Sequence, residues 1–135
     1  MRIVVDSFAW IEIFLGSRIG QSAFRQIQDA EIVVTPETVL AEIARKYLRE
    51  GAREQIIRSR LNTISESSEL SGIDEATALV SGKAYLEIQE KARKEKIEKP
   101  SLFDAIVLAC ARINGAKVLT GDQHFKGLPE TVWLE

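Results

Sequence analysis

Residues 2–16 read RIVVDSFAWIEIFLG, and this stretch decides the fold. The run Ile3-Val4-Val5 is short and wholly apolar, as expected of a strand that is buried on both faces of a parallel sheet. Asp6 ends the run, and the apolar stretch 7–15 that follows has the length of a helix and stops at Gly16. A buried strand that leads directly into a helix is the beginning of an α/β unit.

The same alternation continues along the chain. Apolar runs at 32–34 and 117–120 predict further buried strands, and 132–134 predicts a final edge strand. The segments between them have helical patterns, and Thr35-Pro36-Glu37 predicts a helix start with a capping hydroxyl and proline at the first helical position. No repeat, linker or low-complexity stretch interrupts the pattern. We therefore expect one domain, residues 1–135, with a mainly parallel sheet covered by helices on both faces.

Composition restricts the chemistry. The chain has 135 residues, 45% of them hydrophobic, and no apolar run of membrane-spanning length, so we expect a soluble cytoplasmic protein without a secretory signal. The single cysteine, Cys110, excludes an internal disulfide. Together with the single histidine, His124, it cannot supply the four ligands of a structural zinc site. A bound metal must therefore be held mainly by oxygen, which favours Mg²⁺, Mn²⁺ or Ca²⁺.

The net charge of −2 lacks the overall basic character that is usual for nucleic-acid binders. Basic residues are nevertheless concentrated in the segment 45–60, which is either a phosphate-binding patch or a solvated helix face. The candidate phosphate contacts in this segment are Arg45, Lys46 and Arg49.

Two aspartates follow predicted strands. Asp6 comes directly after the first strand, and Asp122 follows the strand 117–120. Ligands of open α/β sheets bind outside the carboxyl ends of the strands, so both positions are candidate ligand positions. A helix cap at Asp6 and a turn at Asp122 are the structural alternatives.

Two further acids lie in helical patterns. Asp104 belongs to the stretch 102–111, which is apolar on nearly every side, so its carboxylate has no solvated face to occupy. The spacing Ser101-x-x-Asp104 also fits a capping box. Glu42 borders the apolar stripe of its helix, where an exposed pair with Lys46 is the alternative.

Taken together, the four carboxylates predict a metal site, because an α/β sheet can bring all of them to one edge. Each close pair would repel by roughly 3 kcal/mol in a medium of effective dielectric near 20. Such a cluster is tolerated when some of the acids are protonated or when a cation lies among them. Clusters of acids alone suit Mg²⁺ or Mn²⁺ together with a substrate phosphate, so the predicted chemistry is phosphodiester hydrolysis.

The chain resembles the PIN-domain nucleases in four segments that span nearly its whole length. These are residues 3–7 (IVVDS), 38–43 (TVLAEI), 101–109 (SLFDAIVLA) and 119–125 (LTGDQHF). The resemblance implies a three-layer α/β/α sandwich with a short parallel sheet. It also implies that the metal-binding and catalytic acids are Asp6, Glu42, Asp104 and Asp122, supported by the hydroxyls of Ser7 and Thr120.

Small single-domain members of that family look like the VapC-type toxins of toxin–antitoxin pairs. The resemblance therefore implies an RNA substrate, an antitoxin partner and a homodimer. An additional acid that the family often has near the last aspartate is missing, because Gln123 and His124 follow Asp122. The number of metal ions is accordingly left open.

Two other classes of function are compatible with parts of the sequence. One is another Mg²⁺-binding α/β domain, such as a receiver or a phosphatase, although Ser7 and Phe8 stand where a second acid would be needed. The other is a PIN-like module that binds RNA or protein without cutting. Neither glycine pattern of the Rossmann and P-loop folds is present. We interpret His124, Cys110 and Trp133 as structural residues, and Trp10 as a packing or dimer residue.

Overall fold

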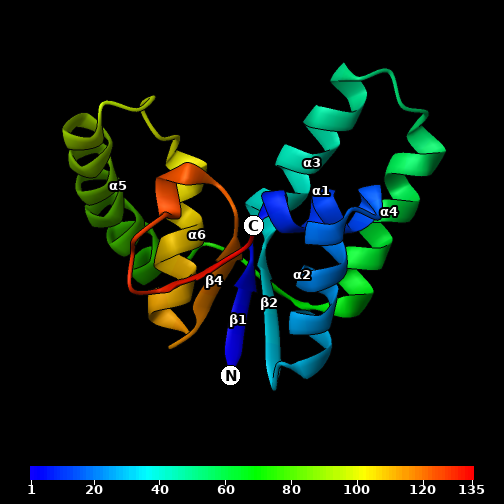
Figure 1. Ribbon diagram of the computed structural model, residues 1–135, viewed down its shortest axis with the longest axis horizontal. Helices are drawn as coiled ribbons and strands as arrows, with labels where there is room; N and C mark the ends of the chain where they lie inside the picture. Colours follow the sequence, from blue (N-terminus) through cyan, green and yellow to red (C-terminus); the bar gives the residue numbers. More distant parts are fainter.

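The computed structural model describes residues 1–135 and contains a five-stranded sheet with helices on both faces (Figure 1). The strand order is β3-β2-β1-β4-β5, and every neighbouring pair is parallel. The predicted α/β/α sandwich is confirmed, and its sheet is parallel throughout. The elements in chain order are β1 (Arg2–Val5), α1 (Ser7–Leu15), α2 (Arg18–Asp29), β2 (Ile32–Pro36), α3 (Glu37–Arg49), α4 (Glu54–Ser67), β3 (Glu69–Ser71), α5 (Glu75–Glu95), α6 (Leu102–Ile113), β4 (Lys117–Thr120), the 3₁₀ turn η1 (Gln123–Phe125) and β5 (Thr131–Trp133).

The helices divide between the two faces according to the direction in which the chain moves across the sheet. From β1 through β2 to β3 the connecting helices are α1 to α4, which lie on one side in Figure 1. The chain then returns through α5 and α6 to β4 on the other side of β1, and these two helices cover the opposite face. Right-handed crossovers require this arrangement. None of the helices combines the length and the hydropathy that crossing a bilayer requires.

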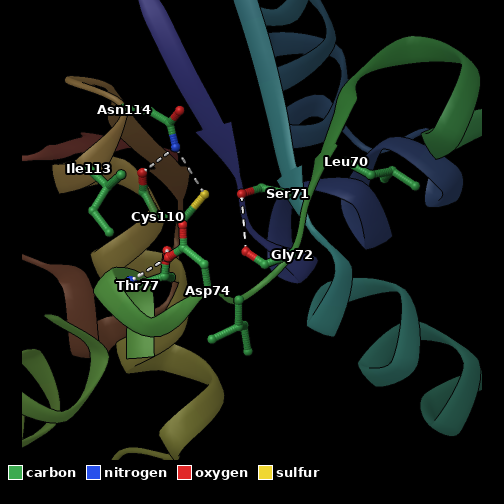
Figure 2. A pocket seen from close by; sticks show the side chains of 9 residues that line it. Leu70, Ser71, Gly72, Asp74, Thr77, Cys110, Ile113 and Asn114 are labelled. Atoms are coloured by element: carbon green, nitrogen blue, oxygen red, sulfur yellow. Dashed lines mark hydrogen bonds between the residues drawn. The ribbon is translucent and has the colours of Figure 1, made fainter. Parts of the chain in front are cut away.

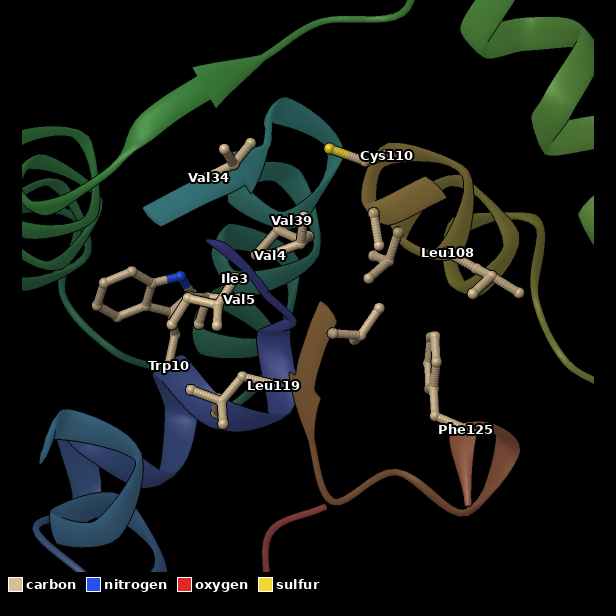
Figure 3. Close-up of a cluster of buried hydrophobic side chains, with 14 of the residues drawn as sticks. Ile3, Val4, Val5, Trp10, Val34, Val39, Leu108, Cys110, Leu119 and Phe125 are labelled. Atoms are coloured by element: carbon tan, nitrogen blue, oxygen red, sulfur yellow. The ribbon is translucent and has the colours of Figure 1, made fainter. Parts of the chain in front are cut away.

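The core lies on both sides of the two central strands, β1 and β4 (Figure 3). Ile3, Val4 and Val5 are at most 1% exposed, and Leu119 of β4 is fully buried. Helix α6 contacts β1, β2 and β4 from one face, and Trp10 of α1 packs into the core with 2% of its surface exposed. Trp10 is therefore a packing residue in this structure. Because neither strand has a solvated face, both read as continuous apolar runs.

Two details of the predicted elements are wrong. Strand β2 continues to Pro36 and α3 begins at Glu37 without a side-chain cap, so Thr35 is not the capping residue. The Thr35 hydroxyl instead accepts a hydrogen bond from the indole of Trp10 and pairs with the hydroxyl of Ser68. The edge strand β3 was not expected, because its residues are polar or exposed and carry no apolar run.

Gly20 marks the closest approach of α2 to α1 and gives a prediction about stability. A Cβ at this position would collide with the carbonyl oxygen of Glu12. We expect Gly20→Ala to lower the free energy of unfolding by about 1–3 kcal/mol, the range for overpacking. Gly82→Ala, in the middle of α5 with nothing within 4 Å of the added carbon, should raise it by roughly 1 kcal/mol. Urea denaturation of both variants tests this contrast, and equal effects would contradict it.

Candidate functional site

The chain first adds β2 and β3 on one side of β1 and then adds β4 and β5 on the other side. The point between β1 and β4, where the connections change direction, is the place where open α/β sheets bind ligands. Both strands end at the same edge, because Val5 lies in register with Leu119. Asp6 follows β1 directly and Asp122 follows β4 after one glycine. The sheet therefore brings together two acids that are far apart in the sequence.

Asp6 is the most buried of the four acids, with 3% of its surface exposed. Its Oδ1 accepts a hydrogen bond from the backbone N–H of Ser7 (2.8 Å), and its Oδ2 accepts one from the Thr120 hydroxyl (2.8 Å). Burial raises the pKa of Asp6 to about 7, against the hydrogen bond from Thr120, and nearby Asp122 and Asp104 raise it further. Asp6 is thus fixed in position but poorly disposed to carry a charge by itself.

The two predicted supporting hydroxyls differ in what they contact. The Thr120 hydroxyl donates to Asp6 and accepts from the backbone N–H of Asp122 (3.0 Å), so it connects two of the acids. The Ser7 side chain forms no hydrogen bond, and Ser7 supports Asp6 through its backbone N–H alone.

Glu42 reaches the same region from the second turn of α3. Burial raises its pKa to about 8, and the charges of Asp6, Asp104 and Asp122 add to the increase, while Arg45 opposes it. The alternative pair with Lys46 does not form, because Lys46 binds Glu50 one turn further on (2.6 Å). The Glu42 carboxyl group therefore faces other acids without a hydrogen bond to the protein.

Asp104 forms the capping box that its sequence position suggests. Its Oδ2 accepts a hydrogen bond from the Ser101 backbone N–H (2.9 Å), and the Ser101 hydroxyl accepts one from the Asp104 N–H (3.2 Å). These two bonds complete a capping box at the start of α6. Burial raises the pKa of Asp104, and the charge of Asp122 contributes. Its Oδ1 has no partner in the protein, so the cap leaves one oxygen for a ligand.

Asp122 is held by His124, which the sequence predicted to be structural without indicating its partners. The Asp122 Oδ1 accepts the backbone N–H of His124 and lies 2.9 Å from its Nδ1. The other ring nitrogen, Nε2, lies 2.7 Å from the carbonyl oxygen of Glu98. Burial lowers the pKa of His124, but the Glu98 carbonyl and Asp122 outweigh it, so the net shift is upward. Both ring nitrogens are thus engaged, while the Oδ2 of Asp122 has no partner in the protein.

The donor set fits a hard divalent cation. Ligand atoms of Asp104, Asp122 and His124 all lie within 4.8 Å of one another, and Asp6 and Glu42 stand outside this group. Because His124 uses both nitrogens for hydrogen bonds, the free donors are carboxylate oxygens, which Mg²⁺ and Mn²⁺ prefer. Burial and the neighbouring acids raise the pKa values of Asp6 and Glu42, so a bound cation would favour their ionised forms near neutral pH.

The predicted phosphate contacts lie on the exposed side of α3. Arg45 and Arg49 are exposed and enter no ion pair, whereas Lys46 is paired with Glu50. Arg60 of α4 stacks on the rings of Phe14 and Tyr47 and is therefore committed to packing. Of the basic residues predicted to bind RNA, two have free charges.

A separate hollow of about 520 Å³ lies between β3, the start of α5 and the end of α6 (Figure 2). Its polar groups satisfy one another. Asp74 accepts hydrogen bonds from the N–H and hydroxyl of Thr77, and the side chain of Asn114 donates to the carbonyl of Cys110. None of the four acids lines it, so this hollow is not part of the site.

Comparisons with known proteins identify relatives of this arrangement. The family model described as PIN domain matches residues 3–130. Among solved structures, VapBC2 of Rickettsia felis bound to a DNA fragment from its promoter has a TM-score of 0.72 at 15% identity, covering 98% of this chain and 97% of that chain. VapC20 of Mycobacterium tuberculosis, described as a Sarcin-Ricin loop cleaving toxin, has a TM-score of 0.71 at 18% identity, covering 98% and 99%.

VapBC-1 of nontypeable Haemophilus influenzae has a TM-score of 0.70 at 18% identity, covering 100% of this chain and 98% of that chain. Identities this low establish a shared fold. The comparison with curated proteins gives no significant match.

Proposed function

This chain belongs to the PIN-domain family, and from that premise we propose that it is a ribonuclease that depends on Mg²⁺ or Mn²⁺. The observation that carries the proposal is the meeting of Asp6, Glu42, Asp104 and Asp122 at one edge of the sheet, where the charges of the three aspartates raise the pKa of Glu42. Structural ion pairs would lower such pKa values. A cluster of acids with unsatisfied oxygens is instead typical of a cation site.

Asp104 and Asp122 would hold the ion through their free oxygens, with Asp6 and Glu42 completing its surroundings. When bound, such an ion activates water as the nucleophile and offsets the charge that develops on the phosphate. The role of the surrounding side chains is to position the carboxylates. Thr120 fixes the Oδ2 of Asp6, and His124 fixes the Oδ1 of Asp122. These hydrogen bonds hold the carboxylates in position against their mutual repulsion.

We further propose that the protein is the toxin of a toxin–antitoxin pair, acting on RNA in the cytoplasm as a homodimer. Relatives of the same length and fold come from VapBC complexes and support an antitoxin partner. The VapC20 relative, described as cleaving the sarcin–ricin loop, supports RNA as the substrate class.

The proposal is tested by incubating single-stranded RNA with the protein in Mg²⁺, in Mn²⁺ and in EDTA. We expect cleavage in either metal and none in EDTA. Glu42→Gln keeps the shape of the side chain but removes its charge, and it should lower kcat/KM at least about tenfold, the smaller effect known for groups that support metal ligands.

Glu66→Gln is the matched control, because Glu66 is an exposed acid on α4. Its activity should equal that of the wild type. Intact RNA in all three conditions would favour a PIN-like module that binds without cutting.

A further inference from the structure

Of the twelve exposed cations that enter no ion pair, six lie in two segments. One is the end of α3 and the connection to α4, with Arg45, Arg49 and Arg53. The other is the end of α5 and the connection to α6, with Lys94, Lys96 and Lys99. Nearby basic residues are already neutralised, since Lys46, Arg58, Lys91 and Arg93 bind glutamates of their own helices. We call residues 45–53 the α3 arm and residues 94–99 the α5 arm.

Both arms are connected to the acidic site. On the α3 arm, Arg45 lies one turn beyond Glu42 and is close enough to lower its pKa. On the α5 arm, the carbonyl of Glu98 binds the ring of His124, which holds Asp122. In Figure 1 the ends of α3 and α5 rise on opposite sides of the sheet, beyond the ends of β1 and β4. A polymer that crosses the acids would therefore meet positive charge on each side.

Lys96 of the α5 arm stands at a position whose backbone conformation favours glycine. It is the only residue other than glycine with a positive φ, 58°, where it ends α5 in the left-handed conformation. Glycine is the favoured residue at this position, because a Cβ makes the conformation strained. A lysine that is less suitable for the backbone than glycine suggests a contribution from its side chain.

We infer that the two arms form one binding surface, which contacts the backbone of single-stranded RNA on either side of the acidic site. Lys94, Lys96 and Lys99 supply the part of this surface that lies opposite the α3 arm. The inference rests on the proposed function and adds the α5 arm as a second region of contact with RNA. The acids repel phosphates, so the cations that attract the substrate must flank them without entering the cluster. Asp6 is 3% exposed, and a single strand can bend toward such a recessed site.

The test measures binding of a fluorescein-labelled oligouridylate in EDTA, at several NaCl concentrations. The slope of log K against log salt is negative, and each lost phosphate contact reduces its magnitude by about 0.7 for single strands. Lys94→Gln with Lys99→Gln should therefore reduce the magnitude of the slope by about 1.4. The matched control is Lys83→Gln with Lys117→Gln, which removes two exposed, unpaired lysines, one of them at the opposite end of β4. This control should keep the wild-type slope.

Lys96→Gly separates binding from folding. We expect a slope whose magnitude is smaller by about 0.7 and a melting temperature that is at least as high as that of the wild type. A loss of binding in a more stable protein cannot come from misfolding.

Equal slopes for the two double variants, or no binding by the wild type, would overturn the inference. So would poly-glutamate that competes as well as oligouridylate at equal charge, which would assign the arms to an acidic protein. Because EDTA removes catalysis from the measurement, failure of the proposed function is recognised separately, as intact binding without cleavage when metal is supplied.

Discussion

Asp104→Asn is expected to abolish metal-dependent RNA cleavage and to leave the protein as stable as the wild type. The free Oδ1 of Asp104 is one of the two carboxylate oxygens best placed to bind a cation. Mutation of residues that only hydrogen-bond to a metal ligand lowers activity by up to ~100-fold, so kcat/KM should fall by more than this when the ligand itself is changed. The fold should survive, because an asparagine oxygen can still accept the Ser101 N–H of the capping box. Removing one charge also relieves repulsion from Asp122.

Asp104→Ala is the companion variant for this prediction. It is expected to be equally inactive but less stable by about 1 kcal/mol, since alanine removes the cap as well as the charge. Cleavage assays and thermal melting in EDTA measure the two effects independently. Normal turnover by Asp104→Asn would remove this residue from the metal site, and a large loss of stability would leave the cap as its main role.

The metal-free protein is expected to lose stability as the pH rises, and Asp6 should be a main cause. Its pKa is 3.8 in the unfolded chain and about 7 in the folded protein, so the folded state binds more protons between these values. The stabilisation that comes from the raised pKa of Asp6 is therefore fully present below about pH 4 and is lost as the pH rises to about 7, roughly 4 kcal/mol at about 1.4 kcal/mol per pH unit. Glu42, with a pKa of about 8, extends the loss to higher pH.

The measurement is the difference in unfolding free energy between the wild type and Asp6→Asn, followed against pH in EDTA and again in Mn²⁺. In EDTA the variant should become the more stable protein as the pH rises. In Mn²⁺ the wild type should recover much of the loss, because a cation that binds only the folded state stabilises it. Asp29→Asn, which changes an exposed aspartate at the end of α2, should follow the wild-type profile. Parallel profiles for the wild type and Asp6→Asn would refute this account.

The sequence predicted most of the sheet and its acids for a clear physical reason. Buried parallel strands are continuous apolar runs, so an acid that follows one stands out, as do Asp6 and Asp122. Asp104 stands out because it interrupts an apolar helix. The meeting of these residues with Glu42 depends on strand order, which local patterns do not encode. Their roles in metal binding and catalysis remain predictions.

The features that were missed depend on tertiary contacts. Strand β3 is a polar edge segment, and only its pairing with β2 identifies it as a strand. In the sequence Thr35 stands where the N-cap of α3 is expected, but in the structure its hydroxyl accepts a hydrogen bond from the Trp10 indole and does not cap the helix. The ring of His124 contacts Glu98, 26 positions earlier, and no spacing in the sequence indicates that contact. Lys46 and Lys94 look alike in the sequence, and only the structure shows which of them is paired.

The parallel pairing of β1 with β4 also has a consequence for the protein while it is being made. The hydrogen bond between Thr120 and Asp6 joins residues 114 positions apart, so β1 must wait for β4 to be synthesised before the two strands can pair. A nascent chain that reaches only residue 116 already contains three of the four acids but lacks the strand that aligns the fourth with Asp6. Pairings over such distances form late in folding. A product that stops before β4 should therefore lack the assembled acidic site.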